Sequence, residues 1–505
     1  METADLFRPI EKPHGRPAGF ALLILAAAIA LAAVCVLSAS ANGWRLAPLA
    51  AAGLAALLWL FKRTTRDSGW LVCALVAVEL LASANLSSQE LQGGSDAART
   101  ATRYVVIALL CAPAIPRALR SGILAQGGFR LYCLYLAWAA VTILYSLVPV
   151  FSAGRLALSV VMFVALSDAV AQVKSERDAS RLIRWFAGGS AVVVALLAAS
   201  IVALPHGVVW VLDPSGIQRF RGFLPSPNQI GALMVTTTAA GFLCWGRASW
   251  LERIGFLLLI ATVVGLALLA DSRSSFVALG AGSVSYLLWR YRLRGLVICL
   301  ALALGLAGAV ALHGRGLGAY ATRGNVTTLT GRTDVWSFAI SQIEESPILG
   351  YGYEVEGAIY QSRYFPLWWG PWDEGPYSSI HNGYLARMVG VGIPATLLWL
   401  FFMLRPIVFV FRSGDDPWAL RPIALLAIIP ILLENMAETA AGDCRNCTGI
   451  LLFLAWAMLE RQRMFVLERA VRERALAHAR LPRAVAALSS IALLASGHGP
   501  AGANG

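Results

Sequence analysis

Long runs of apolar residues alternate with short polar segments rich in arginine along most of the chain. The apolar runs are continuous blocks rather than stripes of period 3.6 or 2, so they do not describe half-buried helices or strands of a soluble domain. A helix crosses the hydrocarbon core of a bilayer with roughly 17–25 mostly apolar residues, and about 12–14 runs approach that length. The pattern therefore predicts an all-α, polytopic transmembrane helix bundle with one large extracytoplasmic loop.

The polar segments divide this bundle into parts. We predict a cytoplasmic N-terminus (1–17), transmembrane helices (18–313), a large periplasmic loop (314–380), C-terminal transmembrane helices (381–460) and a basic cytoplasmic tail (461–505). The first apolar run is longer than the roughly 7–15 residues of a signal-peptide core, so we expect an uncleaved first span.

Composition and charge narrow the class of protein further. Hydrophobic residues make up 58% of the 505 positions and charged residues 14%, which excludes an ordinary soluble protein. The net charge of +13 could indicate a nucleic-acid partner. However, most of the 41 Lys and Arg residues fall in alternate connections, as cytoplasmic loops require. We therefore predict a multi-pass protein of the bacterial inner membrane, in contact with membrane lipids and with no nucleic-acid partner.

Several arginines lie on the opposite, extracytoplasmic side in this topology, where the sorting rule disfavours them. They are Arg219, Arg221, Arg273, Arg315, Arg323, Arg332 and Arg363. A guanidinium group offers paired donors that match phosphate oxygens, so these residues are candidates for binding a lipid-linked phosphate or diphosphate. The alternative for each is a lipid headgroup contact or a local ion pair.

His381 follows the long polar loop and opens the next apolar run. It enters the membrane from the same side as the surplus arginines, and histidine can act as a base near neutral pH. The alternative is a structural hydrogen bond, which is also our expectation for His206 and His313. The aromatic residues of the loop form either an interfacial belt or a platform for sugar rings.

Two cysteines, Cys444 and Cys447, form a C-x-x-C in a polar turn. The pair could be a disulfide, half of a metal site or neither, and no second C-x-x-C is present to complete a zinc site.

The arginines and His381 sit in short motifs that occur in a fixed order. These are Arg219-Phe-Arg221-Gly222 before Pro227-Asn228, then Asp271-Ser272-Arg273, then Thr330-Gly331-Arg332 leading to Gly350-Tyr351-Gly352, and finally His381-Asn382. Together they resemble the superfamily of O-antigen ligases and polysaccharide polymerases, bacterial inner-membrane glycan transferases.

The resemblance implies an enzyme that uses neither metal nor cofactor. It would transfer a glycan from undecaprenyl diphosphate to an acceptor hydroxyl on lipid A-core, on another repeat unit or on a protein. Carried over by motif, His381 and Arg273 would be catalytic, while Arg219, Arg221 and Arg332 would bind the diphosphate. The Arg-x-Arg spacing leaves open whether Arg219 or Arg221 is the functional residue.

The sequence does not separate a ligase from a polymerase. A transporter or flippase of lipid-linked sugars is the alternative from another class, but it needs charged groups along a path through the membrane. Here the surplus cations gather at one face, which favours catalysis.

Overall fold

The computed structural model describes residues 62–64, 67–82, 104–212, 218–224, 226–301, 332–364, 380–413, 416–439 and 446–495. The predicted N-terminal segment and first span, Arg315, Arg323, His313, Cys444 and part of the 314–380 loop lie outside these ranges. Nearly all of the described chain is helical, and its sheet consists of one two-stranded hairpin, so the all-α prediction is confirmed.

The helices are α3 (Ser68–Ala82), α5 (Ala114–Ser121), α6 (Gly127–Thr142), α7 (Pro149–Ala171), α8 (Glu176–Ala203), α9 (His206–Val209), α10 (Pro227–Trp245), α11 (Trp250–Leu269), α12 (Arg273–Tyr291), α14 (Arg332–Glu345), α15 (Glu356–Ile359), α17 (Gly383–Arg412), α18 (Arg421–Ile423), α19 (Ile429–Glu434) and α20 (Cys447–Ala495). Shorter turns are the 3₁₀ segments η2 (Ile123–Ala125) and η3 (Ile143–Tyr145) and the π segments η4 (Tyr360–Tyr364) and η5 (Ala424–Ile428). The hairpin pairs β1 (Trp210–Leu212) with β2 (Gln218–Phe220).

Within the described ranges, 5 helices are long and apolar enough to cross a membrane. They are α6 with η3, α7, α8, α11 and α17. A sixth span is obtained if Tyr104–Cys111 and α5, which meet at 50°, are counted as one bent helix. The chain is therefore a multi-pass membrane protein, while the total of about 12–14 spans stays a prediction.

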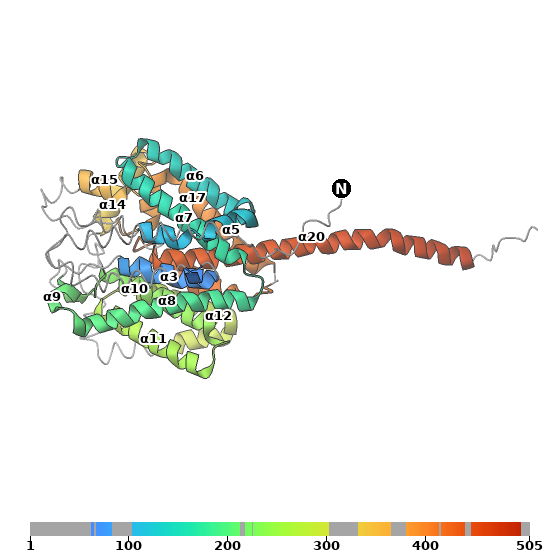
Figure 1. The fold of residues 1–505 in the computed structure, drawn as a ribbon, viewed down its shortest axis with the longest axis horizontal. Helices are drawn as coiled ribbons and strands as arrows, with labels where there is room; N and C mark the ends of the chain where they lie inside the picture. The colour runs from blue at the N-terminus through green and yellow to red at the C-terminus, as the bar shows by residue number, and fades with distance from the viewer. Residues whose placement is uncertain are drawn as a thin grey trace, which may run out of the picture.

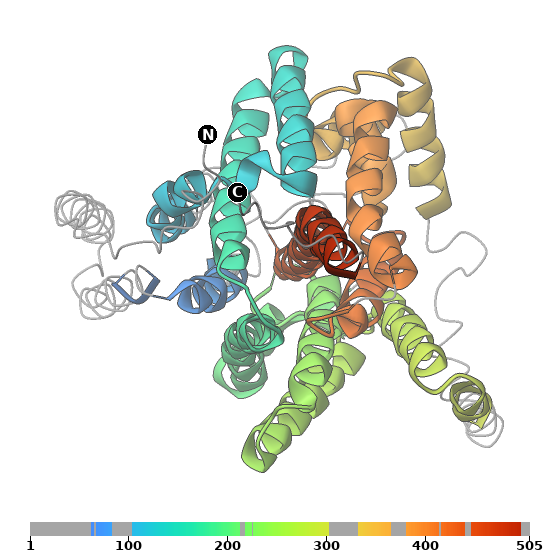
Figure 2. The same ribbon diagram turned by 90° about the vertical axis from the view of Figure 1, so that its right-hand side faces the viewer.

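The first part of α20 occupies the centre of the bundle. Figure 2 shows this helix surrounded by the others, and residues from Ile450 to Leu459 are almost completely buried. The same helix then continues out of the bundle as a single rod (Figure 1). The last predicted span and the basic tail as far as Ala495 are thus parts of one helix.

A break in α17 receives the Gly350-Tyr351-Gly352 motif. Gly392 has φ +83° inside the helix, and the chain before α15 docks there through Tyr351 N to Val389 O (2.9 Å) and Gly352 N to Gly390 O (2.8 Å). A Cβ on Gly350 would lie 2.5 Å from Gly390 O. Glycine is required at this position both by the close approach and by its φ of +66°. The motif therefore anchors the segment that follows α14 onto α17.

Candidate functional site

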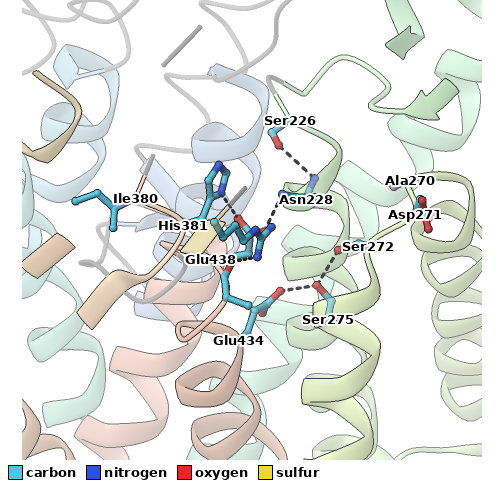
Figure 3. Close-up of polar contacts among 12 residues, drawn as sticks. Ser226, Asn228, Ala270, Asp271, Ser272, Ser275, Ile380, His381, Glu434 and Glu438 are labelled. Atoms are coloured by element: carbon cyan, nitrogen blue, oxygen red, sulfur yellow. Dashed lines mark hydrogen bonds and ion pairs between the residues drawn. The ribbon is translucent and has the colours of Figure 1, made fainter. Parts of the chain in front are cut away.

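Glu438, in the turn beyond α19, is the centre of a polar cluster. Its Oε1 accepts hydrogen bonds from Arg332 Nη2 (2.6 Å) and Asn228 Nδ2 (2.8 Å), and its Oε2 lies 3.2 Å from His381 Nδ1. Figure 3 shows His381 and Asn228 on different sides of this carboxylate. One acidic side chain thus joins residues from three motifs that are far apart in the sequence.

Three local features bring His381 to Glu438. Asn382 caps the N-terminus of α17 through its side chain, and His381 has a φ of +51°, which turns the chain immediately before the helix. Gly383 N donates to Asn435 O (2.8 Å), and a Cβ at Gly383 would lie 2.0 Å from Asn435 Oδ1. The glycine therefore allows α17 to begin directly against the turn that carries Glu438.

Arg332 is the first residue of α14. One of its guanidinium nitrogens pairs with Glu438, and the other donates to Ala437 O. The helix is held in place by Trp336, whose Nε1 donates to Ile380 O at 3.0 Å, one residue before His381. Arg332 and His381 are therefore fixed relative to each other by backbone contacts as well as through Glu438.

Arg219, on β2, extends the cluster through Asn228. Its Nη2 donates to Asn228 Oδ1 (2.7 Å), and its Nε donates to Ala270 O (2.9 Å). A longer contact of 3.3 Å reaches Asp271 O. Arg219 thus ties the hairpin to the N-terminus of α10 and to the turn that leads into α12.

Arg273 is the first residue of α12 and is half-buried beside that turn. Below it, Ser272 and Ser275 share a hydrogen bond of 2.9 Å, and Ser275 donates to Glu434 Oε1 at 2.6 Å (Figure 3). Gly231 of α10 lies directly against both serines, since a Cβ there would come within 2.2 Å of each hydroxyl oxygen. This close packing fixes the start of α12, and with it the backbone of Arg273, next to Arg219.

Two of the predicted arginines point away from the cluster. Arg221 is 9% exposed and donates from Nε to Val208 O (3.0 Å), and burial lowers the pKa of its guanidinium. Arg363 contacts Gln342, Glu345 (3.1 Å) and Tyr351 within its own segment. Arg363 therefore forms a local ion pair, which was the alternative to phosphate binding for this residue.

The central carboxylate is charged although it is mostly buried. Burial alone would raise the pKa of Glu438, but the hydrogen bond and charge of His381, together with the Arg332 guanidinium, lower it below its ordinary value. The side chain of Glu438 is 13% exposed, against 36% for His381 and 24% for Arg332. His381 and Arg332 are therefore more exposed than the carboxylate that joins them.

Sequence reasoning missed Glu438 and Glu434. The apolar run folds continuously as α18, η5 and α19; Glu434 is the last residue of α19 and Glu438 lies just beyond it, and an acidic residue at the end of such a run is a detectable signal. It also missed Arg387 in α17, which donates to Tyr135 Oη and lies 4.2 Å from the centre of a Trp399 ring. Arg387 lines a small cavity of about 30 Å³ next to the cluster. Its other lining residues include Glu354, Glu356, Gly383 and Thr439.

The structure does not test whether Cys444 and Cys447 form a disulfide or half of a metal site. Among the residues that the structure describes, no three His, Cys, Asp or Glu side chains are grouped as metal ligands would be. Cys447 is a buried thiol at the start of α20, while its possible partner Cys444 is not among the described residues.

The fold and the cluster define a class: a multi-pass helical membrane protein with a histidine, carboxylate and arginine site at one end of its bundle. Residues 255–400 match the family model described as O-antigen ligase. This match confirms the resemblance and supports membership of the O-antigen ligase superfamily. A comparison with curated proteins gives no match.

The matched region carries Arg273, Arg332 and His381, whereas Arg219, Asn228 and Glu438 lie outside it. The matched domain supports a glycosyltransferase-like role in lipopolysaccharide or polysaccharide biosynthesis, and its family implies lipid-linked glycans and polysaccharide acceptors in general as substrates.

Proposed function

We propose that this protein transfers a glycan from undecaprenyl diphosphate to an acceptor hydroxyl at the periplasmic face of the inner membrane. The observation that carries the proposal is the hydrogen-bonded cluster in which Glu438 joins His381, Arg332 and Asn228. A base, its orienting carboxylate and a guanidinium are thus assembled at one point from distant parts of the chain.

In this proposal His381 is the base that accepts the acceptor proton. Because the Glu438 carboxylate accepts from Nδ1–H, it favours the tautomer whose Nε2 carries the free lone pair. The His381 side chain is 36% exposed, which leaves room for a substrate to approach it. A positioned general base contributes roughly 10²–10⁴-fold to the rate.

The arginines bind and stabilise the diphosphate. During transfer the acceptor oxygen bonds to the anomeric carbon, the bond from that carbon to the phosphate oxygen breaks, and the proton passes to His381. Negative charge grows on the departing diphosphate, and fixed guanidinium groups stabilise it. We assign this role to Arg273, Arg219 and Arg332, because Arg219 contacts the turn before Arg273 and is linked through Asn228 to Glu438, the carboxylate that pairs with Arg332.

Arg221 is left out of this assignment, since its guanidinium is turned to the backbone of α9. The reaction needs no metal or cofactor in this scheme, because the arginines stabilise the negative charge that grows on the departing diphosphate. The acceptor is lipid A-core for a ligase and a second lipid-linked glycan for a polymerase.

A flippase of lipid-linked sugars is the other function considered. It would need polar groups spread through the depth of the bundle. With the exception of Arg221, the predicted site residues instead lie around the Glu438 turn, near which α12, α14 and α17 begin. This placement favours glycan transfer over transport of a lipid-linked sugar across the membrane.

The test is transfer by the full-length protein reconstituted in liposomes, with a lipid-linked oligosaccharide as donor, lipid A-core as acceptor and EDTA present. Wild type should release undecaprenyl diphosphate and form the conjugate, and Arg273→Ala should not. Arg290→Ala, at the other end of α12, is the matched control and should retain the rate. Equal rates for the two variants would remove Arg273 from the site.

A deletion strain separates the two branches of the superfamily. Unattached long glycans in that strain indicate a lost ligase, and single capped repeat units indicate a lost polymerase. A normal surface glycan would contradict both.

A further inference from the structure

A second basic site lies at the end of α8 opposite the hairpin. Arg177, Arg181, Arg184 and Gly188 follow one another at helical spacing on one face of this helix. Together with Trp185 and with Arg247 from the α10–α11 turn, they line an open pocket of about 920 Å³. At a rise of 1.5 Å per residue, the lining residues of α8 lie about 22–39 Å along the helix from its hairpin end at Ala203.

Ion pairs hold three of the arginines at the rim. Arg181 pairs with Asp67, Arg247 with Glu176, and Arg184 lies 3.6 Å from Glu252. A guanidinium has five N–H donors, so a single carboxylate contact leaves donors for another ligand. Arg177 has no ion pair among the residues that the structure describes. The lining itself contains no carboxylate, so the interior of the pocket is cationic.

The apolar wall of the pocket is built by tight helix packing. Trp185 packs against Trp70 of α3 with ring centres 4.4 Å apart and ring planes tilted by 46°, and a Cβ on Gly69 would lie 2.0 Å from the Trp185 ring. Gly189 packs just as closely on α3, since a Cβ there would lie 2.6 Å from Cys73 O. By contrast, a Cβ on Gly188 would meet nothing within 4 Å. Gly188 therefore leaves open space in the pocket next to the tightly packed Trp185 indole.

From Gly188 toward the C-terminal end of α8, the same side of the helix is apolar and exposed. Val192 is 47% exposed and Leu196 is 43% exposed, and Ala195 and Ala199 are exposed as well. A cationic pocket with an indole at its edge and an apolar strip running on from it matches an amphiphile with an anionic head.

We propose that this pocket binds the phosphate of an anionic glycerophospholipid whose acyl chain lies along the exposed strip of α8. The membrane-sorting rule explains arginines at this end of the bundle but requires neither a pocket nor their alignment on one face. Basic pockets between transmembrane helices are known receptors for anionic headgroups. The proposal is independent of glycan transfer and uses none of the residues of the Glu438 cluster.

The experiment is native mass spectrometry of the full-length protein in detergent, titrated with dioctanoyl-phosphatidylglycerol, dioctanoyl-phosphatidylcholine or inorganic phosphate. Wild type should bind the anionic phosphatidylglycerol in preference to phosphatidylcholine. Arg177→Gln should weaken that binding about fivefold, as expected for one guanidinium near a phosphate. Gly188→Leu should weaken it without any change of charge.

Arg412→Gln is the control, because it removes one exposed arginine from the end of α17 outside the pocket. Equal weakening by Arg412→Gln, or unchanged affinity in both pocket variants, would overturn the proposal. Phosphate binding that depends on Arg177 without any preference for the anionic lipid would identify a site for free anions and overturn the lipid assignment. If Arg177→Gln fails to fold, Gly188→Leu decides, since its new side chain points into open space.

Discussion

His381 Nδ1 and Glu438 Oε2 lie 3.2 Å apart although 57 positions separate them in the chain. The contact joins the start of α17 to the turn after α19, and it gives the histidine a carboxylate partner. The first prediction follows from it. Glu438→Gln should lower glycan transfer by roughly 10²-fold, at the low end of the range for general-base catalysis, because the amide cannot stabilise a protonated imidazole.

The measurement is the initial rate in liposomes per folded molecule. Glu345→Gln is the control: Glu345 also pairs with an arginine, Arg363, but at an exposed position where an ion pair contributes about 0–1 kcal/mol. A rate for Glu438→Gln equal to that of this control would mean that the carboxylate does not act through His381.

The Arg-x-Arg motif gives the second prediction. Arg219→Lys should reduce transfer strongly, since lysine lacks the planar fork that contacts Asn228 and Ala270 O together. Arg221→Lys should keep the rate per folded molecule and lose stability instead, because Val208 O would lose its buried donor at a cost of about 1–3 kcal/mol. Measuring both rate and Tm for the two variants separates the roles, and a reversed pattern would reassign the motif to Arg221.

The sequence predicted the helical class, the clustering of arginines with His381, and the order of the motifs. It could not choose between Arg219 and Arg221, because two residues at i and i+2 lie on the same face of an extended strand. Strand β2 ends at Phe220, and only the folded hairpin shows that Arg219 faces Asn228 while Arg221 turns to Val208 O. The break in α17 was not predicted either. Pro394 follows Gly392 and disfavours a regular helix there, but the position of the break is seen only with the Gly350 turn docked against Gly392.

Glu438 shows a different limit of sequence reasoning. Its position at the end of an apolar run was visible, but its partners come from α10, α14 and α17, and no short motif connects them. Contacts between elements so distant in the sequence depend on how the helices pack.

The third prediction concerns the packing under Arg273. Gly231→Ala should destabilise the protein by about 1–3 kcal/mol, because its methyl group would overlap Ser272 and Ser275. Gly255→Ala in α11 is the matched control, where a Cβ meets nothing within 4 Å and alanine favours the helix by roughly 1 kcal/mol. Thermal unfolding in detergent should show a lower Tm for Gly231→Ala alone. Equal Tm values would indicate that α10 and α12 are not in close contact at this point.

The fourth prediction concerns the pH dependence of the stability that Glu438 gives to the fold. Its pKa is lowered in the folded protein, so its interactions stabilise the fold above the unfolded pKa of about 4.3 and are lost as the pH falls through the lower, folded value. Wild type should therefore have a higher Tm than Glu438→Gln at neutral pH, and the difference should shrink once the pH is below about 4. A difference that stays constant down to that range would contradict a charged Glu438.

The rate of glycan transfer by His381→Ala tests the central claim most directly. His206→Ala is the matched control, because His206 is an exposed histidine that stacks on Trp210 with ring centres 5.6 Å apart and makes no contact with Glu438 among the described interactions. In reconstituted liposomes, His381→Ala should lose roughly 10²–10⁴-fold in rate at unchanged protein abundance, while His206→Ala keeps the wild-type rate. Full transfer by His381→Ala would contradict the assignment of the Glu438 cluster as the site of catalysis.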